Sequence, residues 1–202
     1  MQSLHSQSAG WGNFLEKVNL ILLRRMIADL EFAPSNRQLV DYWLSLCQDD
    51  KLPDRSAFRP ADVRPLLANL VIYDVVPGKS VTVRLAGTTF NIALGLELKG
   101  RDWVKLAPEN HRPQRLRGFT DIAMGAIGRG LRRVEMLPTG YYTFEGIMLP
   151  CHADRNSDVH PVVGHIDWNP GREFVKIKSP EQALGAPLVS FEVIPLPALR
   201  VG

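Results

Sequence analysis

The densest group of side chains able to do chemistry lies in the stretch CHADRNSDVHPVVGH, residues 151–165. Imidazole and carboxylate groups are common ligands of divalent metal ions in proteins. The spacing fits no compact metal motif, and the polar residues in the stretch are typical of a hairpin loop. We therefore predict no metal site and keep a small metal-dependent enzyme as the alternative hypothesis. Its ligands would come from His152, Asp154, Asp158, His160 and His165.

A second candidate is Glu145, which interrupts the apolar run YYTFEGIMLP. In a strand, alternation places Glu145 on the face of Tyr141 and Thr143, away from the more apolar set. No motif puts a second carboxylate or a histidine beside it, as acid–base catalysis would require. We therefore predict a structural role, with Arg132 or Arg133 as a cross-strand partner, and predict no catalytic residue.

Other chemical motifs are absent or in the wrong order. The sequence has no G-x-S-x-G, H-E-x-x-H or Walker loop. The glycine-rich GAIGRG follows a predicted helix and precedes a predicted strand, whereas a nucleotide loop needs the reverse order. Cys47 and Cys151 fit no zinc motif or disulfide framework, so each is predicted to be a buried, inert thiol.

The charge pattern does not favour nucleic acid as a partner. The net charge is only +3, and the basic residues are scattered rather than striped. The densest arginines, at positions 112, 115, 117, 129, 132 and 133, are interpreted as a solvated helix face rather than a phosphate site.

The composition is that of an ordinary globular protein. The chain has 202 residues, of which 45% are hydrophobic and 22% are charged, so one domain with extensions is expected. The longest apolar run near the N-terminus, Leu20 to Leu23, is far shorter than the roughly 20 residues of a membrane span. Because Arg24 and Arg25 follow that run, a secretion signal is not favoured. We predict a cytoplasmic protein with no membrane association.

The elements that must position these residues begin with two helices. Residues 1–10 are polar, and an apolar stripe then predicts a helix over Trp11–Phe32. Such a helix must dock on its own domain or on a second copy of the chain. Whether Met26 is the true start stays open. Ser35 is a predicted N-cap for the next helix. The apolar stripe of the first helix consists of Trp11, Leu15, Val18, Leu22 and Met26.

Beyond Leu70 the hydrophobic period changes to two. LVIYDVV and SVTVRLAG are predicted strands joined by a turn, and a helical block with one long helix follows. LRRVEML, YYTFEGIMLP and VVGHIDW are three further predicted strands, and the tail is expected to add a strand or a covering arm. This order predicts an α+β fold with a five-stranded antiparallel sheet and helices on one face. The expected parts are an N-terminal tail and helix (1–34), the domain (35–170) and a C-terminal tail or covering strand (171–202).

Glycines mark the ends of several of these elements. Gly87 is predicted to relax the backbone where a strand turns into a helix, and Thr88 to cap that helix. Gly95 and Gly100 are predicted at helix ends with positive φ.

An ordered set of short motifs carries a family resemblance. Over roughly residues 36–168 the chain resembles a family of short bacterial proteins that consist of a single PAS domain. The element order is also that of the PAS fold. The motifs are Tyr42-Trp43, Leu52-Pro53-x-Arg55, Pro60-x-Asp62, Leu66-Leu67, Arg84-x-x-Gly87-Thr88, Gly95 with Leu98 and Gly100-Arg101, and Leu149-Pro150.

The resemblance implies a sensory or signalling module without catalytic activity. PAS domains hold a small ligand between the sheet and the longer helix, or they pair with other proteins. Core packing explains each candidate lining residue equally well. The candidates are Phe90, Trp103, Phe119, Ile122, Tyr142, Phe144 and Met148.

The resemblance leaves the cofactor unknown. Flavin photosensors of this fold carry a cysteine on the helix after the second strand, where this chain has TTFNIALG. A haem ligand would be a histidine on the long helix, and only His111 stands near it, at its start. A lone sensor acts through a partner, so we expect a homodimer formed by the helix Trp11–Phe32, and a separate signalling protein is a further candidate partner.

Overall fold

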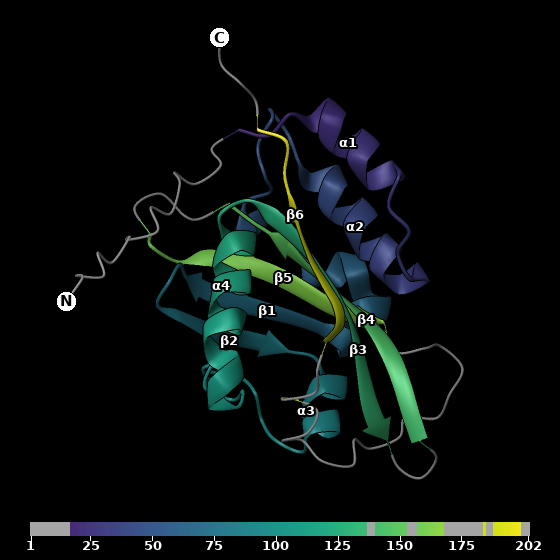
Figure 1. The fold of residues 1–202 in the computed structure, drawn as a ribbon. Coiled ribbons are helices and arrows are strands. Elements are labelled where there is room, and N and C mark those ends of the chain that lie inside the picture. Colours follow the sequence, from purple (N-terminus) through teal and green to yellow (C-terminus); the bar gives the residue numbers. More distant parts are fainter. Residues whose placement is uncertain (1–16, 137–139, 153–156, 168–183, 185–187, 199–202) are drawn as a thin grey trace, which may run out of the picture.

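The computed structural model describes residues 17–136, 140–152, 157–167, 184 and 188–198 (Figure 1). The described residues form an α+β fold around one antiparallel sheet, which confirms the PAS-like fold class. The strands are β1 (Leu70–Val76), β2 (Ser80–Ala86), β3 (Ala126–Met136), β4 (Gly140–Pro150), β5 (His160–Asp167) and β6 (Leu188–Pro195). In the described part of the chain, six strands lie in the order β2-β1-β5-β4-β3-β6. The sixth strand, from the tail, pairs with the outer edge of β3.

Helices cover both faces of this sheet, whereas the sequence predicted them on one face. In Figure 1, α4 lies over one face and α1 and α2 lie over the other. Burial of both faces explains why β1 and β5 are almost continuously buried along their length. The helices are α1 (Leu20–Ala28), α2 (Pro34–Leu46), α3 (Thr88–Leu94) and α4 (Arg112–Ala123), with short 3₁₀ helices η1 (Arg55–Ala57), η2 (Pro60–Asn69) and η3 (Glu109–His111).

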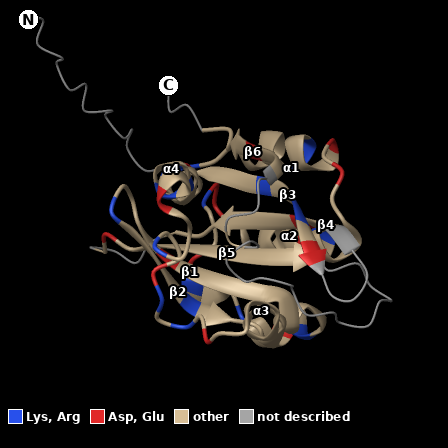
Figure 2. Cartoon of the chain, turned by 60° about the horizontal axis from the view of Figure 1, so that its bottom comes forward, with Lys and Arg blue, Asp and Glu red and all other residues tan. Residues whose placement is uncertain are grey.

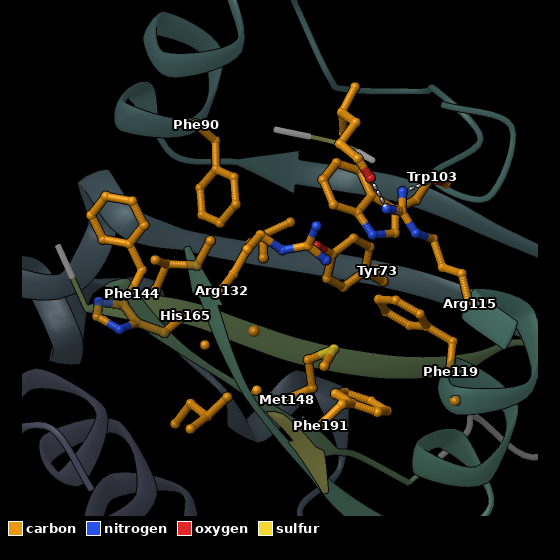
Figure 3. Close-up of a pocket in the computed structure, with 18 of the residues that line it drawn as sticks. Tyr73, Phe90, Trp103, Arg115, Phe119, Arg132, Phe144, Met148, His165 and Phe191 are labelled. Atoms are coloured by element: carbon orange, nitrogen blue, oxygen red, sulfur yellow. Dashed lines mark hydrogen bonds between the residues drawn. The ribbon is translucent and has the colours of Figure 1, made fainter. Parts of the chain in front are cut away.

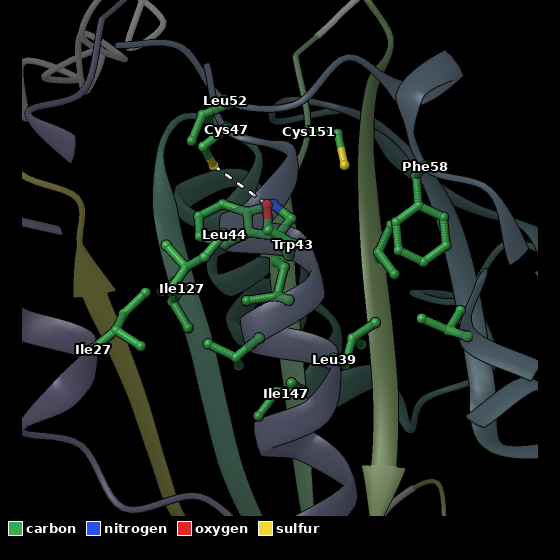
Figure 4. Packing of buried hydrophobic residues seen from close by; sticks show 14 of the residues in the cluster. Ile27, Leu39, Trp43, Leu44, Cys47, Leu52, Phe58, Ile127, Ile147 and Cys151 are labelled. Atoms are coloured by element: carbon green, nitrogen blue, oxygen red, sulfur yellow. Dashed lines mark hydrogen bonds between the residues drawn. The ribbon is translucent and has the colours of Figure 1, made fainter. Parts of the chain in front are cut away.

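Each face of the sheet has its own hydrophobic core. The α2-side core gathers around Trp43, which is fully buried and donates its indole N–H to the carbonyl of Pro150 at 2.8 Å (Figure 4). A buried indole N–H needs such a partner, because an unpaired donor would be costly. The α4-side core lies between the sheet and the helices α3 and α4. It includes Val71, Tyr73, Val83, Phe90, Phe119, Ile122, Phe144 and Val162.

The N-terminal helix is shorter than predicted. It begins at Leu20, because Asn19 caps it by accepting a hydrogen bond from the Leu22 N–H at 3.1 Å. Residues 17–19 are therefore not helical, and Val18 instead forms a bridge with Ala198. Residues 11–16 lie outside the described residues. The buried face of α1 is also different from the predicted stripe.

That buried face is made by Leu23 and Ile27, which belong to the α2-side core. Leu22, expected inside, is 48% exposed, and Ile21 is 73% exposed. Arg37 of α2 donates hydrogen bonds to the carbonyls of Ile27 and Leu30. These contacts satisfy backbone acceptors near the end of α1 and fix it on α2.

The glycines around α3 have two different roles. Gly95 ends α3 with φ 63°, as predicted. Gly87 has φ −64°, which any residue adopts, so the prediction that it relaxes the backbone is wrong. A Cβ there would lie 2.3 Å from the carbonyl oxygens of Leu67 and Ala68, so glycine is needed for close approach. Gly87 is itself the N-cap, and no side chain caps α3, so the predicted Thr88 cap is also wrong.

Charged residues are spread over many elements, as predicted (Figure 2). None of the helices in the described ranges is long and apolar enough to cross a membrane.

Candidate functional site

A hollow in the sheet faces α4, where two glycines lie side by side. Gly130 on β3 pairs directly with Gly146 on β4. A Cβ added at Gly146 would meet no atom closer than 3.8 Å. On the next strand, a Cβ at Gly164 would approach Val71 to 2.9 Å, so that glycine serves packing instead. Because residues 130 and 146 lack side chains, the core leaves a space above them.

Aromatic side chains surround this space and enclose a cavity of about 420 Å³. That volume lies in the lower part of the range of about 300–1,000 Å³ typical of small-molecule sites. Tyr73 packs edge-on against Phe119, with ring centroids 4.8 Å apart. In Figure 3, rings from both sheet and helices point toward one cavity. They belong to Tyr73, Phe90, Trp103, Phe119, Phe144 and Phe191.

Trp103 reaches the cavity because the segment before it pairs with the free edge of β2. The Trp103 N–H donates to the Val81 carbonyl at 2.7 Å, and the Val83 N–H donates to the Arg101 carbonyl at 2.9 Å. This pairing covers the edge of β2 and places the indole at the cavity wall.

Five of the seven predicted lining residues line the cavity. They are Phe90, Trp103, Phe119, Phe144 and Met148. Ile122 is fully buried in the α4-side core and is not among the lining residues. The Tyr142 side chain lies outside the described residues. Ligand contact by these residues stays a prediction.

Two arginines of the cavity contradict the interpretation as a solvated helix face. Arg115 of α4 and Arg132 of β3 both line the cavity. Arg115 donates to the carbonyls of Trp103 and Leu184, and its guanidinium lies 5.2 Å from the Trp103 ring centroid. Burial, followed by the charge of Arg132, lowers the pKa of Arg115 to about 10. Burial also lowers the pKa of Arg132.

The sequence contains a signal that Arg115 faces the cavity. Arg115 precedes Phe119 by four residues, so the two share a helix face, and Phe119 was already a predicted lining residue. Tyr73 likewise alternates with Val71 and Val75, which marks an inward face of β1. The Gly130–Gly146 pair had no such signal, because it depends on the register of two strands.

On the opposite face of the sheet, Glu145 is buried and is only 8% exposed. Its carboxylate accepts hydrogen bonds from the Asn36 amide at 2.9 Å and from the Ala33 N–H at 3.1 Å. It also pairs with Arg129 at 3.1 Å. Each of these contacts joins β4 to a neighbouring element. This is the environment expected of a carboxylate with a structural role.

Two details of the Glu145 prediction are wrong. The cation that pairs with Glu145 is Arg129, whereas the prediction named Arg132 or Arg133. The face of Glu145 is also not the less apolar one, since Ile147 and Leu149 on that face belong to the α2-side core.

His165 belongs to the same polar cluster, which we call the Asn36 cluster. Its Nδ1 lies 2.7 Å from Asn36 Oδ1. Because the Asn36 amide nitrogen donates to Glu145, Asn36 Oδ1 is the acceptor and His165 Nδ1 carries the proton. Burial lowers the pKa of His165 to about 4, so its ring is neutral at pH 7. The cluster consists of Ser35, Asn36, Arg129, Glu145, His165 and Asp167.

His165 does not converge with His152 on one point in the described structure. His165 faces Asn36, whereas His152 lies 3.9 Å from Asp54. Within the described ranges, which omit Asp154, no group of three metal-ligating side chains occurs. Cys47 and Cys151 are free and buried, as predicted, and burial raises the pKa of each to about 12.

Comparison with known proteins identifies the family. A family model described as a PAS domain matches residues 31–165, which is more than half of the chain. A search of curated proteins found no match. The matched range includes β1 to β4 and nearly all of the elements that form the cavity, with β6 outside it. The chain therefore belongs to the PAS domain family.

Proposed function

We propose that this chain is a sensory module that binds a small organic ligand in the cavity between its sheet and α4. The observation that carries the proposal is the hollow above Gly130 and Gly146. It lies between the sheet and the longest helix of that face, and aromatic side chains wall it. A concave, mainly apolar site with a few polar groups is the usual form of a small-molecule site.

The lining supports binding rather than catalysis. Among the described residues that line the cavity there is no Asp, Glu, Ser, Thr or Cys. A nucleophile with an adjacent base, or a pair of carboxylates, is what hydrolytic and group-transfer sites require. We therefore propose that the module has no catalytic activity of its own.

We further propose that it acts in the cytoplasm through a protein partner. Ile21 and Leu22 of α1 present apolar surface on the side away from the core. Such a patch fits a homodimer through α1, with a separate signalling protein as the receiver. The predicted boundaries, 1–34, 35–170 and 171–202, are kept as part of this proposal.

Native and denaturing mass spectra of the full chain, with an absorption scan alongside, test the ligand proposal. We expect extra mass in the native spectrum that is lost on denaturation. Gly146→Leu fills the floor of the cavity and should remove that mass. Thr143→Leu is the matched control, because it adds a similar side chain at an exposed position of the same strand.

Two results would count against the cavity as the site. One is a ligand that Gly146→Leu retains in full. The other is a wild-type chain that shows no extra mass in the native spectrum after incubation with a small-metabolite extract.

A further inference from the structure

The polar side chains that line this mainly apolar cavity include two cations. Two guanidinium groups, from Arg115 and Arg132, line it. No carboxylate occurs among the lining residues that the structure describes. In Figure 3, Arg132 extends across the cavity toward Tyr73, and Arg115 lies beside Trp103. The two cations therefore approach the same space from opposite walls, β3 and α4.

The described contacts of Arg115 are with neutral groups. Its described hydrogen bonds go to neutral carbonyls of Trp103 and Leu184, and its flat face lies over an aromatic ring. These contacts hold the guanidinium in place without neutralising its charge. A half-buried cation of this kind gains from an anionic group brought into the cavity, and a planar guanidinium fits a carboxylate well.

We propose that the ligand of this cavity is a small organic carboxylate with an aromatic or branched apolar body. Its carboxylate is held by Arg115 and Arg132, and its body lies over the Gly130–Gly146 floor. This inference rests on the proposed ligand-binding function and names the ligand class of that same cavity.

The shape and polarity of the cavity favour a carboxylate over a phosphate. The body of the ligand meets aromatic rings of Phe90, Phe144 and Phe119, so it must be apolar. A phosphate ester carries up to two charges and more acceptor oxygens, which need more donors than a mainly apolar cavity offers. A single negative charge fits two guanidinium groups with less desolvation.

Phenylacetate and phenylacetamide provide the test, because they share a shape and differ in charge. Binding to the full chain is measured by calorimetry and ligand-detected NMR at 0.2 M salt, with phenyl phosphate, benzoate and 3-methylbutanoate alongside. We expect at least one carboxylate to bind, and to bind about tenfold or more tightly than its amide, because charge-assisted hydrogen bonds are the stronger kind. Arg132→Gln should remove most of that difference. Arg133→Gln should keep it, because Arg133 is the exposed neighbour on the same strand.

The outcomes separate this inference from the proposed function. If acid and amide bind equally and Gly146→Leu blocks both, the cavity is a ligand site but the inference is overturned. Tighter binding of phenyl phosphate, or no binding of any carboxylate, also overturns it. If Gly146→Leu leaves phenylacetate binding unchanged, the binding lies elsewhere and the proposed function fails as well. The comparison of acid and amide on the wild-type chain stands even if Arg132→Gln does not fold.

Discussion

The side-chain amide of Asn36 donates a hydrogen bond of 2.9 Å to the carboxylate of Glu145, which joins α2 to β4. The same carboxylate accepts from the Ala33 N–H just before α2 and pairs with Arg129 on β3. One acidic side chain thus connects two strands of the sheet to the start of the helix that covers them. Asp167 adds a second connection, because it accepts hydrogen bonds from the backbone N–H and hydroxyl of Ser35.

Glu145→Ala should therefore destabilise the fold strongly. It leaves the Asn36 amide with only the backbone carbonyl of residue 145 as an acceptor, and it leaves Arg129 without its buried partner. Breaking a buried pair from one side typically costs about 3–5 kcal/mol in free energy of unfolding. Urea denaturation followed by circular dichroism measures the loss.

Glu192→Ala is the control on the same arginine. Glu192 lies 4.0 Å from Arg129 but is 56% exposed, so its removal should cost less than about 1 kcal/mol. Equal losses in the free energy of unfolding for the two variants would contradict the prediction, because they would show that burial does not make Glu145 the more important partner of Arg129.

His165 makes the stability of the fold depend on pH. Its pKa is about 4 in the folded chain and about 6.5 when unfolded, because burial disfavours the charged ring. Between these values the unfolded state binds more protons, so the free energy of unfolding falls as pH is lowered from about 6.5 to about 4. One such group contributes up to about 1.4 kcal/mol per pH unit.

His165→Asn isolates this contribution. The asparagine amide can donate to Asn36 Oδ1 in place of Nδ1 but does not titrate in this range. We expect a flatter pH dependence of the urea midpoint for the variant than for the wild type. His160, whose pKa burial also lowers, titrates in both proteins, and its contribution cancels in the difference. Parallel curves would contradict the assignment to His165.

Alternation predicts the strands and which residues share a face of each strand. It does not predict which helices cover each face of the sheet. Alternation correctly separated Phe144 and Met148 from Glu145 and Ile147. It could not show that α2 folds back over the second face, because that depends on contacts more than a hundred residues apart, such as Asn36 with Glu145. A carboxylate that was expected on the less apolar face is therefore buried.

The aromatic walls of the cavity were largely predictable, and its floor and charges were not. Phe90, Phe119 and Phe144 are large apolar residues on the inward sides of their elements. The floor exists because Gly130 and Gly146 meet in register, which no local pattern encodes. The arginine-rich pattern predicts a solvated position for Arg115, because a charged residue on a core-facing stripe goes against the usual pattern.

Gly87→Ala should be among the most damaging small substitutions in the chain. Its Cβ would overlap the backbone carbonyl oxygens of Leu67 and Ala68 at 2.3 Å, and backbone atoms of η2 cannot move aside as a flexible side chain can. We expect a loss of about 3 kcal/mol or more in the free energy of unfolding.

Gly146→Ala is the matched control, because its Cβ would meet nothing closer than 3.8 Å. Its stability should lie within about 1 kcal/mol of the wild type. A Gly87→Ala protein as stable as Gly146→Ala would show that the close approach is not maintained in solution.

The proposed homodimer through α1 can be tested at Ile21, the most exposed large apolar residue in the described ranges. Truncating the chain at Met26 would also remove Leu23, which is part of the α2-side core, so a surface substitution is the cleaner test. Ile21→Glu leaves the core intact and places a charge in the proposed interface, where it should break the dimer. Sedimentation velocity should show a dimer for the wild type and a monomer for Ile21→Glu. Ile92→Glu, at a 58% exposed position on α3, should stay dimeric. A monomeric wild type, or a dimer that survives Ile21→Glu, would rule out this interface.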